Sequence, residues 1–270
     1  MIDIHSHILP AIDDGSPDLE TSIKMAQIAV SEGITEMIAT PHFIEKDKET
    51  DKNTIIQKVE ELNRELAHRS IDLTILPGQE IFLTPGVPDL YDRGKLLTLC
   101  DGDKYLLVEL PLMSIPLYAL DVIHSLKLKG LNVILAHPER NIEIARNPGR
   151  LREFIKIGAL VQVNSLTLFG VLGKNAKHTA ENIINSGMAH FIATDCHTAR
   201  TRSPRIKRIM KFLTEDAAKL LLKDNPSKVL KGKDIDSKLE AYDGKDIGFF
   251  KKLTVFIDSI KNAREVRHDF

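Results

Sequence analysis

Cysteine, charge of one sign and long hydrophobic runs are all scarce in this chain of 270 residues. The two cysteines, Cys100 and Cys196, are too few for a disulfide framework. The 37 Lys and Arg residues balance 38 Asp and Glu residues, so the net charge of -1 offers no basic field for a nucleic-acid backbone. No apolar run approaches the roughly 18 residues of a membrane span, and the first residues lack the basic and apolar regions of a signal peptide. We therefore expect a cytoplasmic protein that binds no nucleic acid.

Hydrophobic periodicity indicates an α/β fold. Hydrophobic residues make up 43% of the chain and charged residues 28%, as in ordinary globular proteins. Short apolar runs, which are typical of buried parallel strands, alternate with longer segments of helical periodicity. Seven such runs are the expected strands, at residues 2–5, 34–39, 73–76, 105–110, 132–136, 160–163 and 191–194.

The segments between these runs contain helix signals. Ser16 and Pro17 provide an N-cap and a first helical residue, and Gly33 follows the end of the pattern. Further helices are expected at residues 53–69, 117–129, 148–157 and 174–186. Distances of roughly 25 to 40 residues between strands suit β/α units. We expect a parallel sheet with helices outside it, closed into a barrel of the TIM type.

The barrel pattern ends near residue 230, so residues 1–230 are expected to form one domain and residues 231–270 a C-terminal extension. Helical patterns at 206–213, 217–222 and 226–230 complete the domain. The extension is first polar and then amphipathic, from Phe249 to Ile260, with several basic residues. We expect a helical tail packed on the barrel, and the alternative is docking of the tail at a membrane surface or on a partner.

Histidine and carboxylate side chains stand at the carboxyl ends of six expected strands, where parallel barrels place their active sites. These residues are His5, His7, His42, Glu80, Glu109, His137, Asp195 and His197. Because residues i and i+2 of an extended strand share a side, His5 is expected beside His7 and Asp195 beside His197. The other histidines, His68, His124, His178, His190 and His268, lie outside this pattern and are expected to be structural.

Divalent cations would explain why so many imidazole and carboxylate groups share one rim. Otherwise these groups would repel one another or be buried without partners. A nitrogen and oxygen ligand set without thiolate suits Mn, Fe, Zn or Co, and of these we expect Mn. One ion rarely takes more than six ligands, so these side chains imply at least two ions, and a bridging Glu80 would allow three.

Two arginines beyond the strand ends indicate an anionic substrate. Arg140 follows His137 closely, and Arg202 follows His197. Guanidinium groups match phosphate oxygens in a bidentate way, so both arginines are candidates for holding a phosphate. The alternative for each is an ordinary surface ion pair.

Residues 196–203 also match the Cys-x5-Arg-Ser pattern of thiolate phosphatases. We expect Cys196 to be a small buried thiol and not a nucleophile. The segment lacks the glycines of a phosphate cradle, Asp195 disfavours a thiolate, and strand alternation turns Cys196 away from Asp195 and His197.

Several segments, taken in order, resemble the metal-dependent protein-tyrosine phosphatases of the PHP superfamily, the bacterial capsule and exopolysaccharide regulators of the CpsB/YwqE type. The matching segments are 1–15, with Asp13-Asp14-Gly15 at its end, 39–42, 77–80, 136–141, which reads Ala-His-Pro-Glu-Arg-Asn, and 194–197. The resemblance covers roughly residues 1–230 and does not include the tail.

This resemblance implies a distorted seven-stranded β/α barrel with a cluster of usually three metal ions at its C-terminal rim. The eight rim residues match the family's ligands, and Arg140 and Arg202 match its phosphate-binding residues. The implied substrate is phosphotyrosine on a cognate bacterial tyrosine kinase that controls capsular or exopolysaccharide biosynthesis.

As a mechanism we expect a metal-bridging hydroxide to attack phosphorus, with Asp14 orienting water or transferring a proton. Asp14 could instead be a turn residue before Gly15. Two other functions stay open at this point. One is a PHP phosphoesterase acting on a small molecule such as histidinol phosphate or a nucleotide, and the other is a noncatalytic metal-binding regulatory module.

Overall fold

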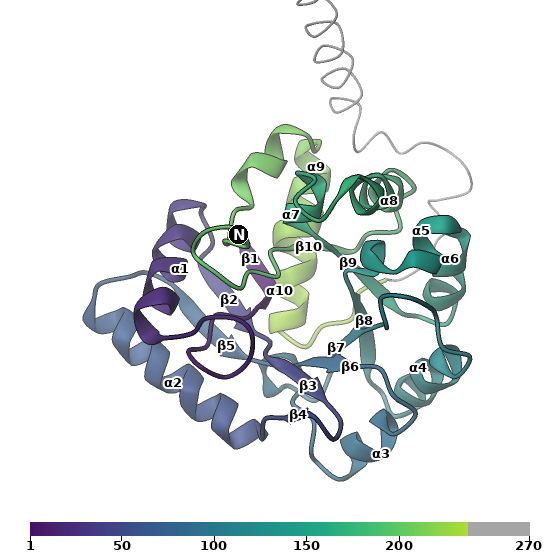
Figure 1. Cartoon of the computed structure of the whole chain (residues 1–270), viewed down its shortest axis with the longest axis horizontal. Coiled ribbons are helices and arrows are strands. Elements are labelled where there is room, and N and C mark those ends of the chain that lie inside the picture. Colours follow the sequence, from purple (N-terminus) through teal and green to yellow (C-terminus); the bar gives the residue numbers. More distant parts are fainter. Residues whose placement is uncertain (237–270) are drawn as a thin grey trace, which may run out of the picture.

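The computed structural model describes residues 1–236, which form a mixed α/β fold with helices arranged around the strands (Figure 1). The strands are β1 (Ile2–Ser6), β2 (Glu36–Ala39), β3 (His42–Ile44), β4 (Lys48–Glu49), β5 (Thr74–Pro77), β6 (Glu80–Phe82), β7 (Tyr105–Glu109), β8 (Asn132–Ala136), β9 (Leu160–Asn164) and β10 (Phe191–Ala193). The α-helices are α1 (Leu19–Ser31), α2 (Lys52–His68), α3 (Val87–Asp92), α4 (Ala119–Leu128), α5 (Ile142–Arg146), α6 (Gly149–Lys156), α7 (Ser165–Leu168), α8 (Lys174–Asn185), α9 (Glu215–Lys219) and α10 (Asn225–Leu230). Shorter helical turns are η1 (Leu99–Asp101), η2 (Pro138–Arg140), η3 (Lys207–Lys211) and the π-helical η4 (Leu220–Asp224).

The strands form two sheets. One has the order β1-β2-β5, and the other has the order β10-β9-β8-β7-β6-β3-β4. All neighbours are parallel except β3 and β4. The predicted alternation of parallel strands and helices is confirmed, whereas the single continuous sheet is not seen in residues 1–236.

Two interruptions separate the sheets. Residues 40–41 lie between β2 and β3, and residues 78–79 lie between β5 and β6. The chain passes from the first sheet to the second at both places, and it returns to the first sheet between β4 and β5. Pro41 has no N–H to donate to a ladder. At the other edge, β1 approaches the segment after β10 through a parallel bridge between Ser6 and Cys196, where the N–H of His7 donates to the carbonyl of Cys196 at 2.9 Å.

Two helix predictions differ from the structure. Helix α1 begins at Leu19 and not after Ser16, because the carboxylate of Asp18 accepts the N–H of Thr21 at 2.7 Å and so provides the N-cap. The pattern at residues 206–213 forms only the 3₁₀ turn η3. Asp18 and Ser16 are both good N-cap residues, so local sequence alone does not choose between them.

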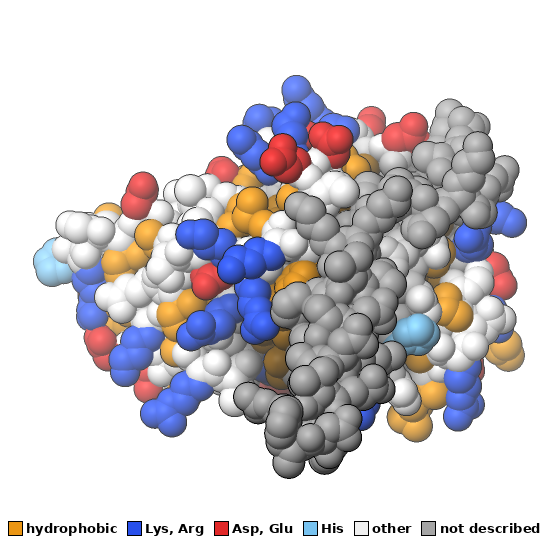
Figure 2. Space-filling view, turned by 90° about the horizontal axis from the view of Figure 1, so that it is seen from above, with side chains coloured by type: hydrophobic (Ala, Val, Ile, Leu, Met, Phe, Trp, Pro, Cys, Tyr) orange, Lys and Arg blue, Asp and Glu red, His pale blue; other side chains and the backbone are white. Residues whose placement is uncertain are grey.

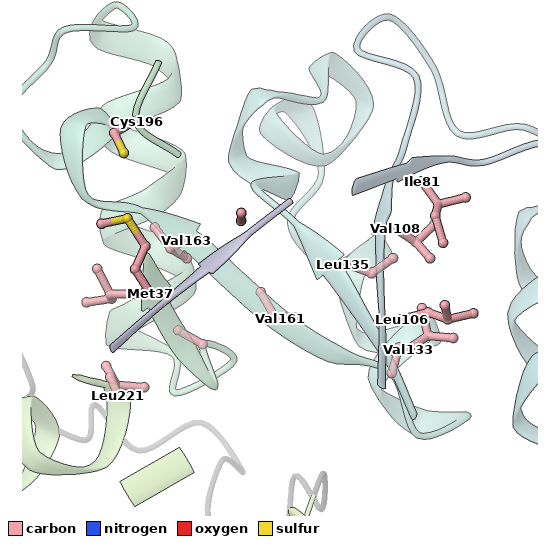
Figure 3. Packing of buried hydrophobic residues seen from close by; sticks show 14 of the residues in the cluster. Met37, Ile81, Leu106, Val108, Val133, Leu135, Val161, Val163, Cys196 and Leu221 are labelled. Carbon is pink, nitrogen blue, oxygen red and sulfur yellow. The ribbon is translucent and has the colours of Figure 1, made fainter. Parts of the chain in front are cut away.

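Alternation along the strands creates two hydrophobic layers. An outer layer lies between the strands and the helices, and Figure 3 shows part of it, including Met37, Leu106 and Val161. A smaller inner layer includes Ile4, Tyr105, Leu107, Ile134 and Phe191. The polar residues described below continue the inner side of the strands at their carboxyl ends. For example, Glu109 follows Leu107 at spacing i+2.

The C-terminal part of the described chain packs back on the strands. The hydroxyl of Tyr105 donates to the carbonyl of Lys233, and Lys104 pairs with Asp234 at 2.8 Å. Within residues 1–236, no helix is long and apolar enough to cross a membrane. The amphipathic helix expected near residues 249–260 lies outside the described residues.

His190 is a buried histidine whose titration should make stability depend on pH. Its Nδ1 accepts the N–H of Val161 at 3.1 Å, and burial lowers its pKa from 6.5 to about 4. The unfolded chain therefore binds a proton below about pH 6.5 that the folded chain does not bind, so stability falls as the pH falls toward 4. From pH 7 to pH 5 we expect this residue to lower the unfolding free energy by about 2 kcal/mol.

Urea denaturation at the two pH values measures the effect. The His190→Asn variant has no titratable ring, and its amide oxygen can accept the same backbone hydrogen bond. Between pH 7 and pH 5, we expect the unfolding free energy of this variant to decrease by about 2 kcal/mol less than that of the wild type. Equal losses in the two proteins would show that His190 does not cause the pH dependence.

Candidate metal centre

The structure brings all eight predicted residues into one cluster. They are His5, His7, His42, Glu80, Glu109, His137, Asp195 and His197. Six lie near or just beyond the carboxyl ends of β1, β7, β8 and β10, whereas His42 and Glu80 are the first residues of β3 and β6, directly after the interruptions that follow β2 and β5. Glu80 lies at the centre. Its Oε2 is 3.3 Å from His5 Nε2, 3.2 Å from His7 Nε2 and 3.0 Å from His42 Nδ1, while its Oε1 is 2.8 Å from His137 Nε2. A carboxylate whose two oxygens face imidazoles on different sides is suited to contact more than one cation.

Two buried atoms in the cluster fit a cation better than a hydrogen-bond partner. Glu80 Oε2 makes no hydrogen bond despite three imidazole nitrogens around it, and His197 Nε2 also has none among the described residues. Buried polar atoms normally have a partner, and metal ions are among the accepted explanations when they do not. The donor set therefore suits divalent cations that prefer nitrogen and oxygen.

The potential ligand atoms fall into four overlapping groups. The groups are His7, Asp14, His42 and His197; His5, His7 and Glu80; His5, His137 and Asp195; and His42, Glu80 and Glu109. Within each group the atoms lie within 4.8 Å of one another. Because several residues belong to two groups, the geometry suits a cluster of ions sharing ligands better than one isolated ion.

Charge pairing dominates the electrostatics of the cluster. Burial alone would raise the pKa of Glu80, but the His5, His137 and His42 rings around it outweigh burial and hold that pKa well below its usual range. Burial likewise disfavours protonation of His7, yet hydrogen bonds with carboxylates raise its pKa well above the ordinary value. Burial and the neighbouring Glu80 charge raise the pKa of Glu109. The cluster thus concentrates groups of opposite charge in a largely buried site.

Two residues of the cluster have left-handed backbone. His137 has φ 30° and ψ 53° just after β8, and Asp195 has φ 51° after β10. Such conformations are uncommon for residues other than glycine and concentrate at functional sites. Asp195 and His197 lie beside each other as expected, with His197 Nδ1 3.5 Å from Asp195 Oδ1. The backbone between them is not the extended strand that was predicted, because β10 ends at Ala193 and Asp195 is left-handed.

Asp14 lies at the solvent side of the cluster. Its carboxylate is 3.3 Å from His42 Nε2, 3.8 Å from His197 Nε2 and 3.6 Å from Lys48 Nζ, and its side chain is 55% exposed. The His42 and His197 rings outweigh partial burial and lower its pKa. Asp14 can therefore contact both the cluster and incoming water, and the geometry also allows it to be a ligand.

The two predicted arginines converge on Asp195. Arg202 donates to Asp195 Oδ2 at 2.7 Å and to the Asp195 carbonyl at 3.3 Å. Arg140 Nη1 is 3.6 Å from the same Oδ2 and 3.5 Å from His137 Nε2. Both side chains are about one quarter exposed, so they border the cluster where an anion would arrive.

Several residues that support the proposed ligands were not predicted from the sequence. Asp13 Oδ2 pairs with His7 Nδ1 at 2.6 Å and also accepts the N–H of His42 at 3.0 Å. The adjacent Gly15 is required for space, since a Cβ there would lie 2.2 Å from the His7 carbonyl oxygen. On β9, Gln162 and Asn164 are buried beside the cluster. Polar residues at spacing i+2 inside an apolar strand were the available signal for the last two.

Cys196 is separated from the cluster. It is fully buried and belongs to the outer hydrophobic layer, where Figure 3 shows it near Met37 and Val163. Burial, assisted by the negative charge of Asp3, raises the pKa of its thiol. A buried, protonated thiol is a poor nucleophile, so the thiolate pattern at residues 196–203 is a coincidence of sequence.

Fold and site together define a mixed α/β protein with a histidine and carboxylate centre of the metal-binding kind. Residues 1–231 match the family described as capsular polysaccharide synthesis, CpsB/CapC. The chain belongs to this CpsB/CapC family, which confirms the resemblance seen in the sequence.

Named relatives agree with this assignment. Tyrosine-protein phosphatase YwqE of Bacillus subtilis is 39% identical over 83% of this chain and 85% of its own length. The putative tyrosine-protein phosphatase CapC of Staphylococcus aureus is 34% identical over 77% of this chain and 82% of its own. A crystal structure from work on YwqE and CpsB of Streptococcus pneumoniae, described as unique metal-dependent tyrosine phosphatases, matches with a TM-score of 0.81 and 36% identity over 87% of this chain and 96% of that one.

Proposed function

We propose that this chain is a metal-dependent protein-tyrosine phosphatase, a phosphoric monoester hydrolase that removes phosphate from tyrosines of a cognate bacterial tyrosine kinase controlling capsule or exopolysaccharide synthesis. The main support is the joint presence of the eight-residue cluster and two arginines at one rim. The names of the relatives support the same substrate class. No feature of residues 1–236 favours the small-molecule or noncatalytic alternative.

The proposed ligands are the eight residues of the cluster, which would hold two or three ions around the central Glu80 carboxylate. Mn is the expected metal, and Fe, Zn or Co would suit the same donors. When bound, such cations supply an activated water and neutralise phosphoryl oxygens.

The remaining roles belong to side chains at the solvent border. Arg140 and Arg202 are proposed to hold the phosphate oxygens, since both guanidinium groups are partly exposed and reach Asp195 at the border of the cluster. Asp14 is proposed to orient water or move a proton there. The departing phenol has a pKa of about 10, so it leaves more easily than an alcohol and needs little help from an acid.

A closed barrel is our proposed interpretation of the two sheets. The bridge between Ser6 and Cys196 joins the β1 edge to the β10 edge, and the interrupted strands β2 with β3 and β5 with β6 connect the sheets on the other side. In this interpretation residues 1–230 are a distorted seven-stranded barrel domain. Several exposed Lys and Arg side chains lie on the face shown in Figure 2. The tail at residues 231–270 is separately proposed to dock near a membrane or on the kinase.

Rates on three phosphoesters test the substrate class. With Mn²⁺ present, kcat/KM for a phosphotyrosyl peptide should exceed that for the same peptide with phosphoserine and that for histidinol phosphate by at least about tenfold, because only the first releases a phenol. The phosphoserine peptide controls for peptide binding. Faster hydrolysis of histidinol phosphate would contradict the proposal, and full Mn²⁺ binding without hydrolysis of any ester would indicate a regulatory module.

A further inference from the structure

Strand β9 contributes none of the proposed ligands, yet it places two amide side chains against them. Gln162 is 0% exposed and Asn164 is 1% exposed. Their neighbours Val161 and Val163 face the outer hydrophobic layer (Figure 3), so the two amides lie on the opposite, inner side of the strand. β9 pairs with β8 on one side and with β10 on the other, and His137 and Asp195 follow those two strands. The amides are therefore between two strands that end in ligands.

The amides form a continuous chain of hydrogen bonds from one ligand to another. Gln162 Oε1 is 2.9 Å from His5 Nδ1, and Gln162 Nε2 donates to Asn164 Oδ1 at 2.8 Å. Asn164 Nδ2 then donates to Asp195 Oδ2 at 2.6 Å. All four side chains are buried.

The donors and acceptors in this series of hydrogen bonds can be arranged in only one way. Asp195 Oδ2 already accepts from Arg202 at 2.7 Å, and a guanidinium cannot accept, so this oxygen is an acceptor. Asn164 must therefore present its NH₂ to Asp195 and its oxygen to Gln162. Gln162 must in turn donate its NH₂ and keep its oxygen for His5. The proton of the His5 ring is thus placed on Nδ1, which leaves Nε2 with a free lone pair.

This arrangement of donors and acceptors also orients the side chains of His5 and Asp195. His5 Nε2 and Asp195 Oδ1 are 3.5 Å apart on the side facing the cluster, while the opposite atoms of the same side chains are held by the amides. β9 also holds the third member of this ligand group. The N–H of His137 donates to Gln162 Oε1 at 3.4 Å, and the Glu139 carboxylate accepts the N–H of Asn164 at 2.8 Å.

We propose that Gln162 and Asn164 are positioning residues that fix the Nδ1–H tautomer of His5 and turn Asp195 Oδ1 toward a cation held by His5, His137 and Asp195. This assignment rests on the metal-binding part of the proposed function and not on its substrate. Supporting residues of this kind fix the tautomer and raise the basicity of a ligating histidine, and their loss typically weakens metal binding about 10- to 100-fold.

Metal binding by two variants of one residue tests the proposal. Gln162→Met keeps the side-chain length and removes the hydrogen bonds to His5, His137 and Asn164. Gln162→Glu keeps an acceptor for His5 Nδ1 and for the His137 N–H, and it loses only the donor to Asn164. Mn²⁺ is titrated calorimetrically into chelator-stripped protein. We expect about 10- to 100-fold weaker binding at one site in Gln162→Met and at least about tenfold recovery in Gln162→Glu. Wild-type affinity in Gln162→Met, or no recovery in Gln162→Glu, would overturn the proposal.

Asn63→Leu is the matched control. Asn63 also makes two amide hydrogen bonds, both to the backbone of Ile75 at 2.8 Å, but it is on α2, away from the ligands. We expect it to lower thermal stability and leave Mn²⁺ affinity unchanged. A loss of Mn²⁺ affinity in Asn63→Leu equal to that in Gln162→Met would attribute the effect to general destabilisation and overturn the assignment.

A second measurement does not depend on the folding of Gln162 variants. In Zn²⁺-loaded protein with ¹⁵N-labelled histidine, the His5 ring, assigned by comparison with His5→Gln, should carry its proton on Nδ1. A proton on Nε2 would refute the tautomer assignment. Both measurements are made without turnover. A protein that binds metal as described but hydrolyses no phosphotyrosine would therefore contradict the proposed function and support this inference.

Discussion

Removal of divalent cations is expected to abolish phosphate release from a phosphotyrosyl peptide, by at least about 1000-fold, with recovery on addition of Mn²⁺. The reason is the concentration of potential ligands around Glu80, whose Oε2 faces three imidazole nitrogens within 3.3 Å without a hydrogen bond. Charge stabilisation by bound metal is worth several kcal/mol in reactions of this type. The measurement is kcat/KM before and after chelation and after readdition of metal.

Two variants separate the metal mechanism from a thiolate mechanism. Cys196→Ser should keep its metal-dependent activity, because the Cys196 side chain lies in the outer hydrophobic layer and is not among the potential ligands of the cluster. His137→Asn should lose activity about as completely as chelation does. Asn tolerates the left-handed backbone at position 137 better than Ala would, so the fold is preserved. Metal-independent activity that disappears in Cys196→Ser would contradict the metal mechanism.

Strand positions and the set of polar residues that form the cluster could be predicted, because both depend on short-range sequence patterns. Each of the seven predicted runs contains or overlaps an observed strand, and the polar residues at their ends meet because parallel strands end at one edge. Period-two alternation placed His5 with His7, whose Nε2 atoms are 3.3 Å apart. Glu109 was expected at the end of a strand, and it is the last residue of β7.

Features set by tertiary contacts could not be predicted in this way. The left-handed backbone of Asp195 is held by its N–H donating to the carbonyl of His5, which is distant in sequence. The break between β2 and β3 depends on how the two sheets meet. Pro41, which has no N–H for a strand ladder, is the one local signal of this break in the sequence. The polar residues Gln162 and Asn164 stand out in an apolar strand, but their role could not be predicted, because it depends on His5 and Asp195 lying beside them.

Arg140 and Arg202 make similar contacts with Asp195 but should differ in what their loss does. Arg202 makes a 2.7 Å hydrogen bond to Asp195 Oδ2, whereas Arg140 approaches the same atom only to 3.6 Å. Arg140 can therefore bind a phosphate oxygen without breaking a short hydrogen bond, whereas Arg202 also holds the proposed ligand Asp195. We expect Arg140→Ala to lower kcat/KM about 100- to 1000-fold with unchanged Mn²⁺ affinity.

Arg202→Ala should lower kcat/KM by a similar factor and should also weaken Mn²⁺ binding, because Asp195 would lose a charge-assisted hydrogen bond. Lysine at either position should restore only part of the activity, since an ammonium group cannot make the bidentate contact. Arg200, exposed on the same loop, provides the control, and Arg200→Ala should stay close to wild type. If Arg202→Ala lost Mn²⁺ affinity while its kcat/KM at saturating Mn²⁺ stayed normal, Arg202 would be a support for Asp195 alone, and phosphate binding would fall to Arg140.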